Sequence, residues 1–84
     1  MIKVFFFASV REELDCDVLE LPWPDDGLHL ETLTEALCVE RGPVWRRVLT
    51  QDNLIVAVNE AITDDHCVIR DGDEVAYFPP VTGG

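Results

Sequence analysis

The chain has 84 residues, 48% of them hydrophobic, so it holds one small domain with enough apolar side chains to bury a core. This composition excludes an intrinsically disordered chain. The chain has 17 acidic and 6 basic residues, which gives a net charge of −11. This charge disfavours nucleic acid and anionic membranes as partners and favours a protein with a basic face. No stretch approaches the roughly 20 apolar residues that a membrane span needs.

The three cysteines, Cys16, Cys38 and Cys67, are widely and irregularly spaced. They form no CxxC pair and lie at no zinc-ligand interval from a histidine, so we expect no metal site and small buried thiols in a reducing compartment. The apolar run at residues 1–8 is too short for a signal peptide, and charged residues follow it where a cleavage region should lie. A cytoplasmic location is therefore expected.

The first half of the chain predicts two strands joined by a short helical turn. Residues 2–7 are almost continuously apolar, which is typical of a central strand covered on both faces. Residues 9–14 fit a helical turn with Ser9 as N-cap. A second strand is predicted at 18–21, and the prolines and glycine of residues 22–27 indicate a turn-forming loop.

The best helix signal lies in the middle of the sequence. Leucines recur at helical spacing from Leu30 to Leu37, with polar residues between them, and predict a helix over 30–41. Gly42 and Pro43 follow, which is the usual end of a helix.

The rest of the chain carries signals of short elements and tight turns. We expect a short helix at 45–49, a buried strand at 54–58, a short strand at 61–62 after a turn at 59–60, and a last strand at 74–78 after a turn at 71–73. This order predicts an α+β fold in which one main helix packs on one face of a mixed sheet. If the first and last strands lie side by side, the chain leaves the sheet at its centre.

The last six residues, Pro79-Pro80-Val81-Thr82-Gly83-Gly84, have the chemistry of an extended tail. The prolines lack amide hydrogens, so strand pairing should stop there, and they favour an extended conformation. Six extended residues reach about 20 Å. The glycines have no side chains, so the final carboxylate could enter a narrow channel. We therefore divide the chain into a domain at 1–78 and an extended tail at 79–84.

A carboxylate at the end of such a tail is unreactive until it is activated. If a partner converts it to an acyl-adenylate with ATP, attack by sulfur gives a thiocarboxylate, whereas attack by a lysine amine gives an isopeptide. In both cases the extended tail of this chain carries the carboxylate to the partner, and the partner catalyses the reaction. We expect no catalytic side chain and no bound cofactor in this chain.

Three segments resemble one known family. The end of the chain from Asp71 to Gly84, the start from Met1 to Glu12 and the stretch Val56-Ala57-Val58-Asn59-Glu60 are similar to the small, sulfur-carrying subunits of molybdopterin synthase (the MoaD family). The resemblance implies a ubiquitin-like β-grasp fold, which agrees with the predicted order of elements.

The resemblance also implies a reaction cycle. An ATP-dependent enzyme related to ubiquitin-activating enzymes would adenylate Gly84, and sulfur transfer would convert it to a thiocarboxylate. The tail would then enter the large synthase subunit, in a heterotetramer of two small and two large subunits, and give sulfur to cyclic pyranopterin monophosphate. The family's docking patch maps onto Phe7, Ile62 and Phe78; the alternative is that Phe7 and Phe78 are ordinary core residues.

Other features leave alternatives open. Tyr77 stands where the family usually has phenylalanine, which should matter little if its hydroxyl reaches water. The acidic residues Asp71, Asp73 and Glu74 would help to steer the chain toward a basic partner. The same tail chemistry could serve another sulfur pathway such as thiamine thiazole formation, or a ubiquitin-like protein modifier, and a plain interaction domain also remains. The Phe-Pro-Pro-Val-Thr spacer favours the molybdopterin carrier.

Overall fold

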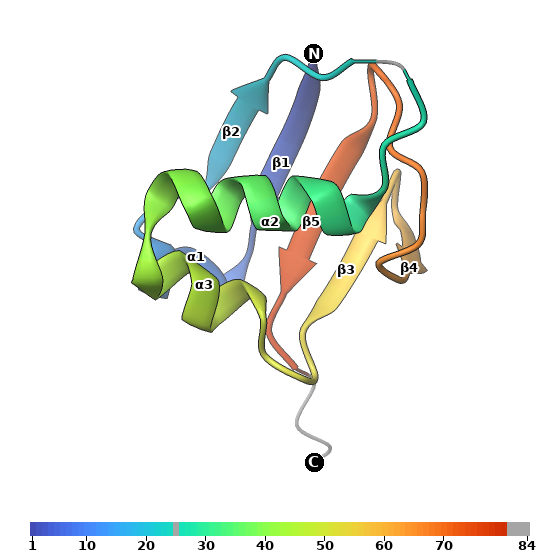
Figure 1. Cartoon of the computed structure of the whole chain (residues 1–84). Coiled ribbons are helices and arrows are strands. Elements are labelled where there is room, and N and C mark those ends of the chain that lie inside the picture. Colours follow the sequence, from blue (N-terminus) through green and yellow to red (C-terminus); the bar gives the residue numbers. More distant parts are fainter. Residues whose placement is uncertain (25, 81–84) are drawn as a thin grey trace.

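Five strands form one mixed sheet with helices against it in a computed structural model that describes residues 1–24 and 26–80 (Figure 1). The elements are, in chain order, β1 (Ile2–Phe6), α1 (Ala8–Leu14), β2 (Val18–Leu21), α2 (Leu30–Arg41), α3 (Pro43–Leu49), β3 (Ile55–Val58), β4 (Ala61–Thr63) and β5 (Glu74–Phe78). The predicted order of elements and the α+β class are confirmed.

The first and last strands are neighbours in the middle of the sheet. The strand order is β2-β1-β5-β3-β4, with β1 and β5 parallel and the other pairs antiparallel. Val4 lies opposite Val75 and Phe6 opposite Tyr77 in the β1–β5 register. The sequence-based expectation that the chain leaves the sheet from its central strand is therefore confirmed up to Pro80, the last residue described.

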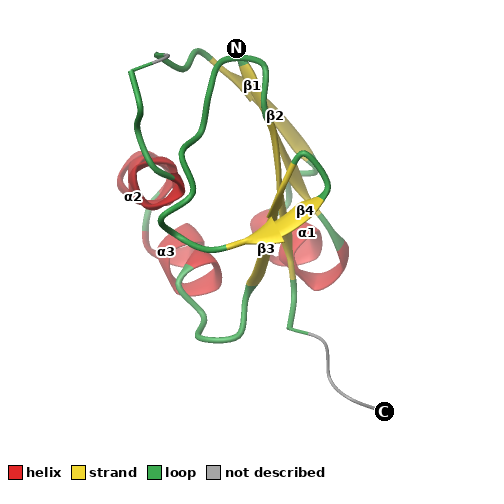
Figure 2. Ribbon diagram, turned by 90° about the vertical axis from the view of Figure 1, so that its right-hand side faces the viewer, coloured by secondary structure: helices red, strands yellow, loops and turns green. Residues whose placement is uncertain are grey.

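Helices α2 and α3 pack on one face of this sheet and cover its apolar core (Figure 2). Figure 2 shows α2 and α3 together on one side of the strands. The leucines at helical spacing on α2 are buried, as predicted. Gly42 separates α2 from α3 with a φ of 102°, and Pro43 occupies the first turn of α3. Phe6 of β1 lies edge-on to Trp45 of α3, with ring centroids 5.2 Å apart.

Two local predictions near the N-terminus are wrong. The strand at 2–7 is not covered on both faces. In β1 the side chains that face the helices are buried, whereas Lys3 is exposed and Phe5 is half-buried. Phe7, the residue after β1, is 38% exposed. Ser9 is not the N-cap of the following helix, because α1 begins at Ala8 with Phe7 as its N-cap and without a side-chain cap.

The Tyr77 hydroxyl does not reach water. The Tyr77 side chain is 1% exposed, and its hydroxyl lies 2.7 Å from the hydroxyl of Thr34 on α2. Burial raises the pKa of Tyr77 well above its ordinary value, and the hydrogen bond to Thr34 only partly offsets this effect. The hydroxyl thus links the central strand to the main helix instead of pointing to solvent.

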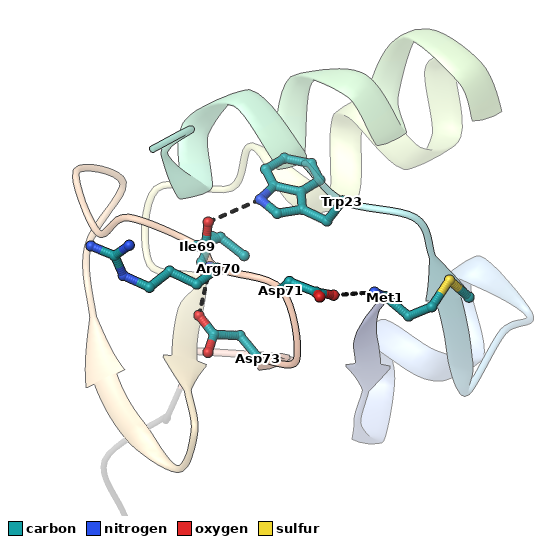
Figure 3. Close-up of polar contacts among 6 residues, drawn as sticks. All are labelled: Met1, Trp23, Ile69, Arg70, Asp71 and Asp73. Carbon is teal, nitrogen blue, oxygen red and sulfur yellow. Dashed lines mark hydrogen bonds and ion pairs between the residues drawn. The ribbon is translucent and has the colours of Figure 1, made fainter. Parts of the chain in front are cut away.

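The loop that leads into β5 is fixed at the end of the sheet opposite to the chain's exit (Figures 1 and 3). The Trp23 indole N–H donates to the Ile69 carbonyl at 3.0 Å, and the Arg70 amide donates to the Asp73 carboxylate at 2.8 Å. The N-terminal ammonium donates to Asp71 and holds the pKa of that carboxyl below its usual range. The loop at 22–27, which has no role assigned from the sequence, therefore contributes Trp23 to the placement of β5.

We expect Tyr77→Phe to lower the free energy of unfolding by about 1 kcal/mol, because it removes the hydrogen bond to Thr34. Urea denaturation of Tyr77→Phe, Thr34→Val and the double variant measures the coupling between the two hydroxyls. Equal stability of Tyr77→Phe and the unchanged chain would contradict the role of this bond.

The same hydroxyl should make stability depend on alkaline pH. Below the ordinary tyrosine pKa of about 10, both folded and unfolded chains keep the proton. Above it the unfolded chain releases the proton while the folded chain retains it, so the free energy of unfolding should fall as pH rises. Tyr77→Phe should lack this fall. Tyr77 is the single tyrosine of the chain, so tyrosinate absorbance reports its titration directly.

Candidate functional site: an apolar groove beside the end of β5

The face of the sheet that α2 and α3 leave uncovered carries an open groove of about 850 Å³. Its floor comes from alternate residues of the central strands, which point away from the core because side chains of a strand alternate between the two faces. Most of the residues around it are apolar. The lining residues are Phe5, Phe7, Ala8, Ile55, Ala57, Glu60, Ile62, Glu74, Ala76, Phe78, Pro79 and Pro80.

The three residues of the expected docking patch all line this groove. Phe7 is 38% and Ile62 is 77% exposed, and Phe78 is half-buried. The rings of Phe7 and Phe78 are stacked, with centroids 4.7 Å apart and 6° between their planes. These residues are therefore not ordinary core residues. They form an exposed apolar face of the kind that marks a protein interface.

Sequence reasoning missed other members of the groove. Phe5 of β1 lies two residues before Phe7, the residue that follows the strand, and the two ring centroids are 6.3 Å apart. Ala76 lies two residues before Phe78 on β5 and also lines the groove. The period of two along a strand is the signal that could have identified both residues. For Phe5, the prediction that residues 2–7 are covered on both faces obscured this signal.

The chain leaves the sheet at this groove. The Phe7 amide donates to the Tyr77 carbonyl at 3.1 Å, which closes the β1–β5 ladder at that end. Pro79 and Pro80 follow, are half-buried and line the groove. The remaining predicted tail residues, Val81, Thr82, Gly83 and Gly84, lie outside the described residues. The exit of the tail and the apolar face are thus parts of one surface.

Carboxylates lie at the other end of the groove. Glu60 and Glu74 line it and are exposed, and neither carboxylate has a hydrogen-bond or ion-pair partner among residues 1–24 and 26–80. The other two acidic residues expected to steer a partner are engaged within the chain: Asp71 binds the N-terminal ammonium, and Asp73 accepts hydrogen bonds from the Arg70 amide and from Asn59. Glu60 was not predicted as a site residue.

Two strained residues also line the groove. Ala8 and Glu60 have φ values of 51° and 70°, in a region that residues other than glycine adopt at a cost of order 1–3 kcal/mol. Asn59, beside Glu60, has a φ of 50°, but its side chain bonds to Asp73 and to the Glu74 amide, and asparagine tolerates this conformation. Glu60 has no comparable local bond.

The described residues offer no other obvious chemistry. Burial raises the pKa of the Cys16 and Cys38 thiols, which disfavours the reactive thiolate. Across residues 1–24 and 26–80, the acidic, histidine and cysteine side chains nowhere gather in a group of three or more that could hold a metal ion. The helices of the same residues include none that is long and apolar enough to span a membrane.

The fold and the groove define the class: a ubiquitin-like β-grasp protein with an apolar sheet face beside its last strand. Solved structures share this fold. Small archaeal modifier protein 1 of Haloferax volcanii aligns with a TM-score of 0.76 at 22% identity, covering 99% of this chain and 98% of its own. A chain of the complex of subunits 1 and 2 of the molybdopterin-converting factor from Helicobacter pylori aligns with a TM-score of 0.65 at 23% identity. This alignment covers 99% of this chain and 97% of the other.

Sequence comparison is more specific than the fold. The ThiS family matches residues 4–84. The molybdopterin synthase sulfur carrier subunits of Haemophilus influenzae and Escherichia coli are 38% and 40% identical to this chain, and each match covers 100% of both chains. The chain therefore belongs to the ThiS family and, within it, to the family of molybdopterin synthase sulfur carrier subunits.

Ile62 and Ile69 allow a matched test of the exposed face. Ile62→Ala should change the free energy of unfolding by less than about 0.5 kcal/mol, because the side chain is 77% exposed. Ile69→Ala should cost about 2–5 kcal/mol, because that side chain is 0% exposed. Urea denaturation measures both. Similar losses in the two variants would show that the folded chain covers the Ile62 side chain.

Proposed function

We propose that this chain carries sulfur as a thiocarboxylate on Gly84 and delivers it for molybdopterin synthesis. Its membership of the sulfur carrier family supports the pathway. One structural observation supports the mechanism: the central strand β5 runs directly into Pro79 and Pro80 at the edge of an exposed apolar face. A partner that binds this face meets the start of the tail at the same place.

The cycle begins with activation of the carboxylate. An ATP-dependent enzyme related to ubiquitin-activating enzymes would bind the chain, and the Gly84 carboxylate would displace pyrophosphate from ATP. A sulfur nucleophile would then displace AMP from the adenylate and leave the thiocarboxylate. This chain contributes no catalytic side chain to these steps, in keeping with the raised pKa values of Cys16 and Cys38. The activating enzyme, and not this chain, binds and uses the ATP. We propose that the cycle takes place in the cytoplasm, the location expected from the sequence.

Delivery takes place in the large subunit of molybdopterin synthase. The apolar groove around Phe7, Ile62 and Phe78 would dock on that subunit, and the narrow glycine end would enter its active site and give sulfur to cyclic pyranopterin monophosphate. The Helicobacter pylori structure, a complex of subunits 1 and 2 of the molybdopterin-converting factor, supports a partner of this kind. Two carriers per large-subunit dimer, giving a 2+2 heterotetramer, complete the proposal.

We expect deletion of Gly84, or Gly83→Trp, to reduce sulfur transfer at least about 100-fold while thermal unfolding stays unchanged, because both changes act on the delivered end and not on the fold. Mass spectrometry of chain isolated from cells that make the cofactor should show one oxygen replaced by sulfur at Gly84. The variant in which Cys16, Cys38 and Cys67 are all alanine should still gain this sulfur.

Two results would overturn the proposed mechanism. One is restored molybdopterin synthesis by the Gly84-deleted chain. The other is a branched peptide on lysine in place of the thiocarboxylate, which would identify a protein modifier.

We also expect Phe78→Asp to weaken binding to the large subunit by about 30-fold or more, because it replaces the stacked aromatic ring beside the tail exit with a charge. Val39→Asp is the matched control: Val39 is 70% exposed on α2, away from the groove, and the same change there should leave affinity unchanged. Isothermal titration calorimetry measures both. Undiminished affinity of folded Phe78→Asp would remove the groove from the interface.

A further inference from the structure

The groove has two chemically different ends. Phe78 and the two prolines mark the end where the chain leaves the sheet, and Glu60 and Glu74 lie at the other end. Because β5 runs from Glu74 to Phe78, at about 3.3 Å per residue the two ends are roughly 13 Å apart. The antiparallel register, Val58 opposite Val75 and Ile55 opposite Phe78, places the β3–β4 turn with Glu60 at the Glu74 end. A partner can therefore distinguish one end of the groove from the other.

Glu60 has a backbone conformation that the turn between β3 and β4 imposes and that suits glycine better than glutamate. It occupies the second position of the two-residue turn between β3 and β4, with a φ of 70°, where glycine is the favoured residue. Asn59 beside it is held by the hydrogen bond from its side-chain N–H to Asp73 and by that from the Glu74 amide to its side-chain oxygen. The Glu60 side chain has no such bond within residues 1–24 and 26–80, yet it lines the groove. The turn alone would favour glycine here, so a glutamate whose carboxylate lies at the groove, unpaired among the described residues, points to a role for that side chain.

From these observations we infer that Glu60 is a specificity-determining residue, which pairs with a lysine or arginine of the protein that docks on the apolar groove. Glu74 supports it at the same end. This pairing fixes which way round the partner lies on the groove, so that the tail at the Phe78 end is aimed into the partner's active site. The inference rests on the proposed function, because it names the chemistry that the docking partner carries at the rim of the interface.

A basic side chain is the complement that this end of the groove requires. An apolar groove alone binds in more than one orientation, since hydrophobic contacts have no direction. A charge at one end of the interface penalises the reversed orientation, where it would lie against an apolar or acidic surface. The charge at the rim stays solvated, so it acts mainly on the rate of association and on its dependence on salt.

The test compares variants of Glu60 in binding to the large synthase subunit. Glu60→Gln removes the charge at constant size, Glu60→Gly also relieves the backbone, and Glu60→Lys reverses the charge. Glu40→Gln, at an exposed position of α2 outside the groove, is the matched control. Association and dissociation rates are measured by surface plasmon resonance at low and high salt, and thermal unfolding is followed in parallel.

We expect Glu60→Gln and Glu60→Gly to weaken binding about three- to fivefold at low salt, mainly through slower association, and Glu60→Lys to weaken it further. The differences should shrink at high salt. Glu60→Gly should unfold at the same temperature as the unchanged chain or at a higher one, because glycine accepts the positive φ. Glu40→Gln should bind normally.

Three results would overturn this inference. The first is unchanged association of Glu60→Gln and Glu60→Lys. The second is lower stability of Glu60→Gly, which would make Glu60 a residue kept for folding. The third is an equal weakening of binding by Glu40→Gln, which would show that the net charge of the chain, and not the position of Glu60, determines the effect. If Phe78→Asp abolishes binding while the Glu60 variants bind normally, the proposed function stands without this inference. If Phe78→Asp also binds normally, the docking proposal fails as well.

Discussion

The parallel pairing of β1 with β5 is the constraint on which the site depends. Parallel strands end at the same edge of a sheet, so the residue after β1 and the last residue of β5 become neighbours. These residues are Phe7 and Phe78, and their rings stack at 4.7 Å. Antiparallel pairing would have placed them at opposite ends. The topology thus brings the apolar face and the start of the tail together, although 71 positions separate Phe7 from Phe78 in the sequence.

A chain of 84 residues can cover only one face of a five-stranded sheet with its helices. That covered face holds the core, in which Phe6 and Tyr77 stack beside Trp45. The uncovered face keeps apolar residues at the alternate positions, where a stability argument alone would favour polar ones. Departures from such folding rules are expected at functional surfaces. The groove is therefore an apolar part of the sheet that the helices leave uncovered, and it is the surface on which we propose that the partner docks.

The sequence predicts the helices and strands better than it predicts which face of each strand is buried. The leucine spacing of α2, the glycine and proline after it, and the bounds of β2 and β5 are local signals, and all of them are confirmed. The continuous apolar run of β1 does not reveal which side chains contact the helices and which lie on the uncovered face, because both surfaces are apolar. The Tyr77–Thr34 bond joins residues 43 positions apart, and the position of Glu60 in the groove depends on strand register, so neither could be predicted from local patterns.

The net charge of −11 explains how a free chain can tolerate this exposed face. Two copies meeting face to face would gain from apolar contact, but each brings the same negative charge and the carboxylates of Glu60 and Glu74 at the groove. The edge strands are short, four residues in β2 and three in β4, which limits pairing of sheets edge to edge. With a partner that has a basic rim, the electrostatic repulsion becomes attraction, and the apolar contact is retained. Under the proposed function, the same charges that oppose self-association therefore favour the complex with this partner.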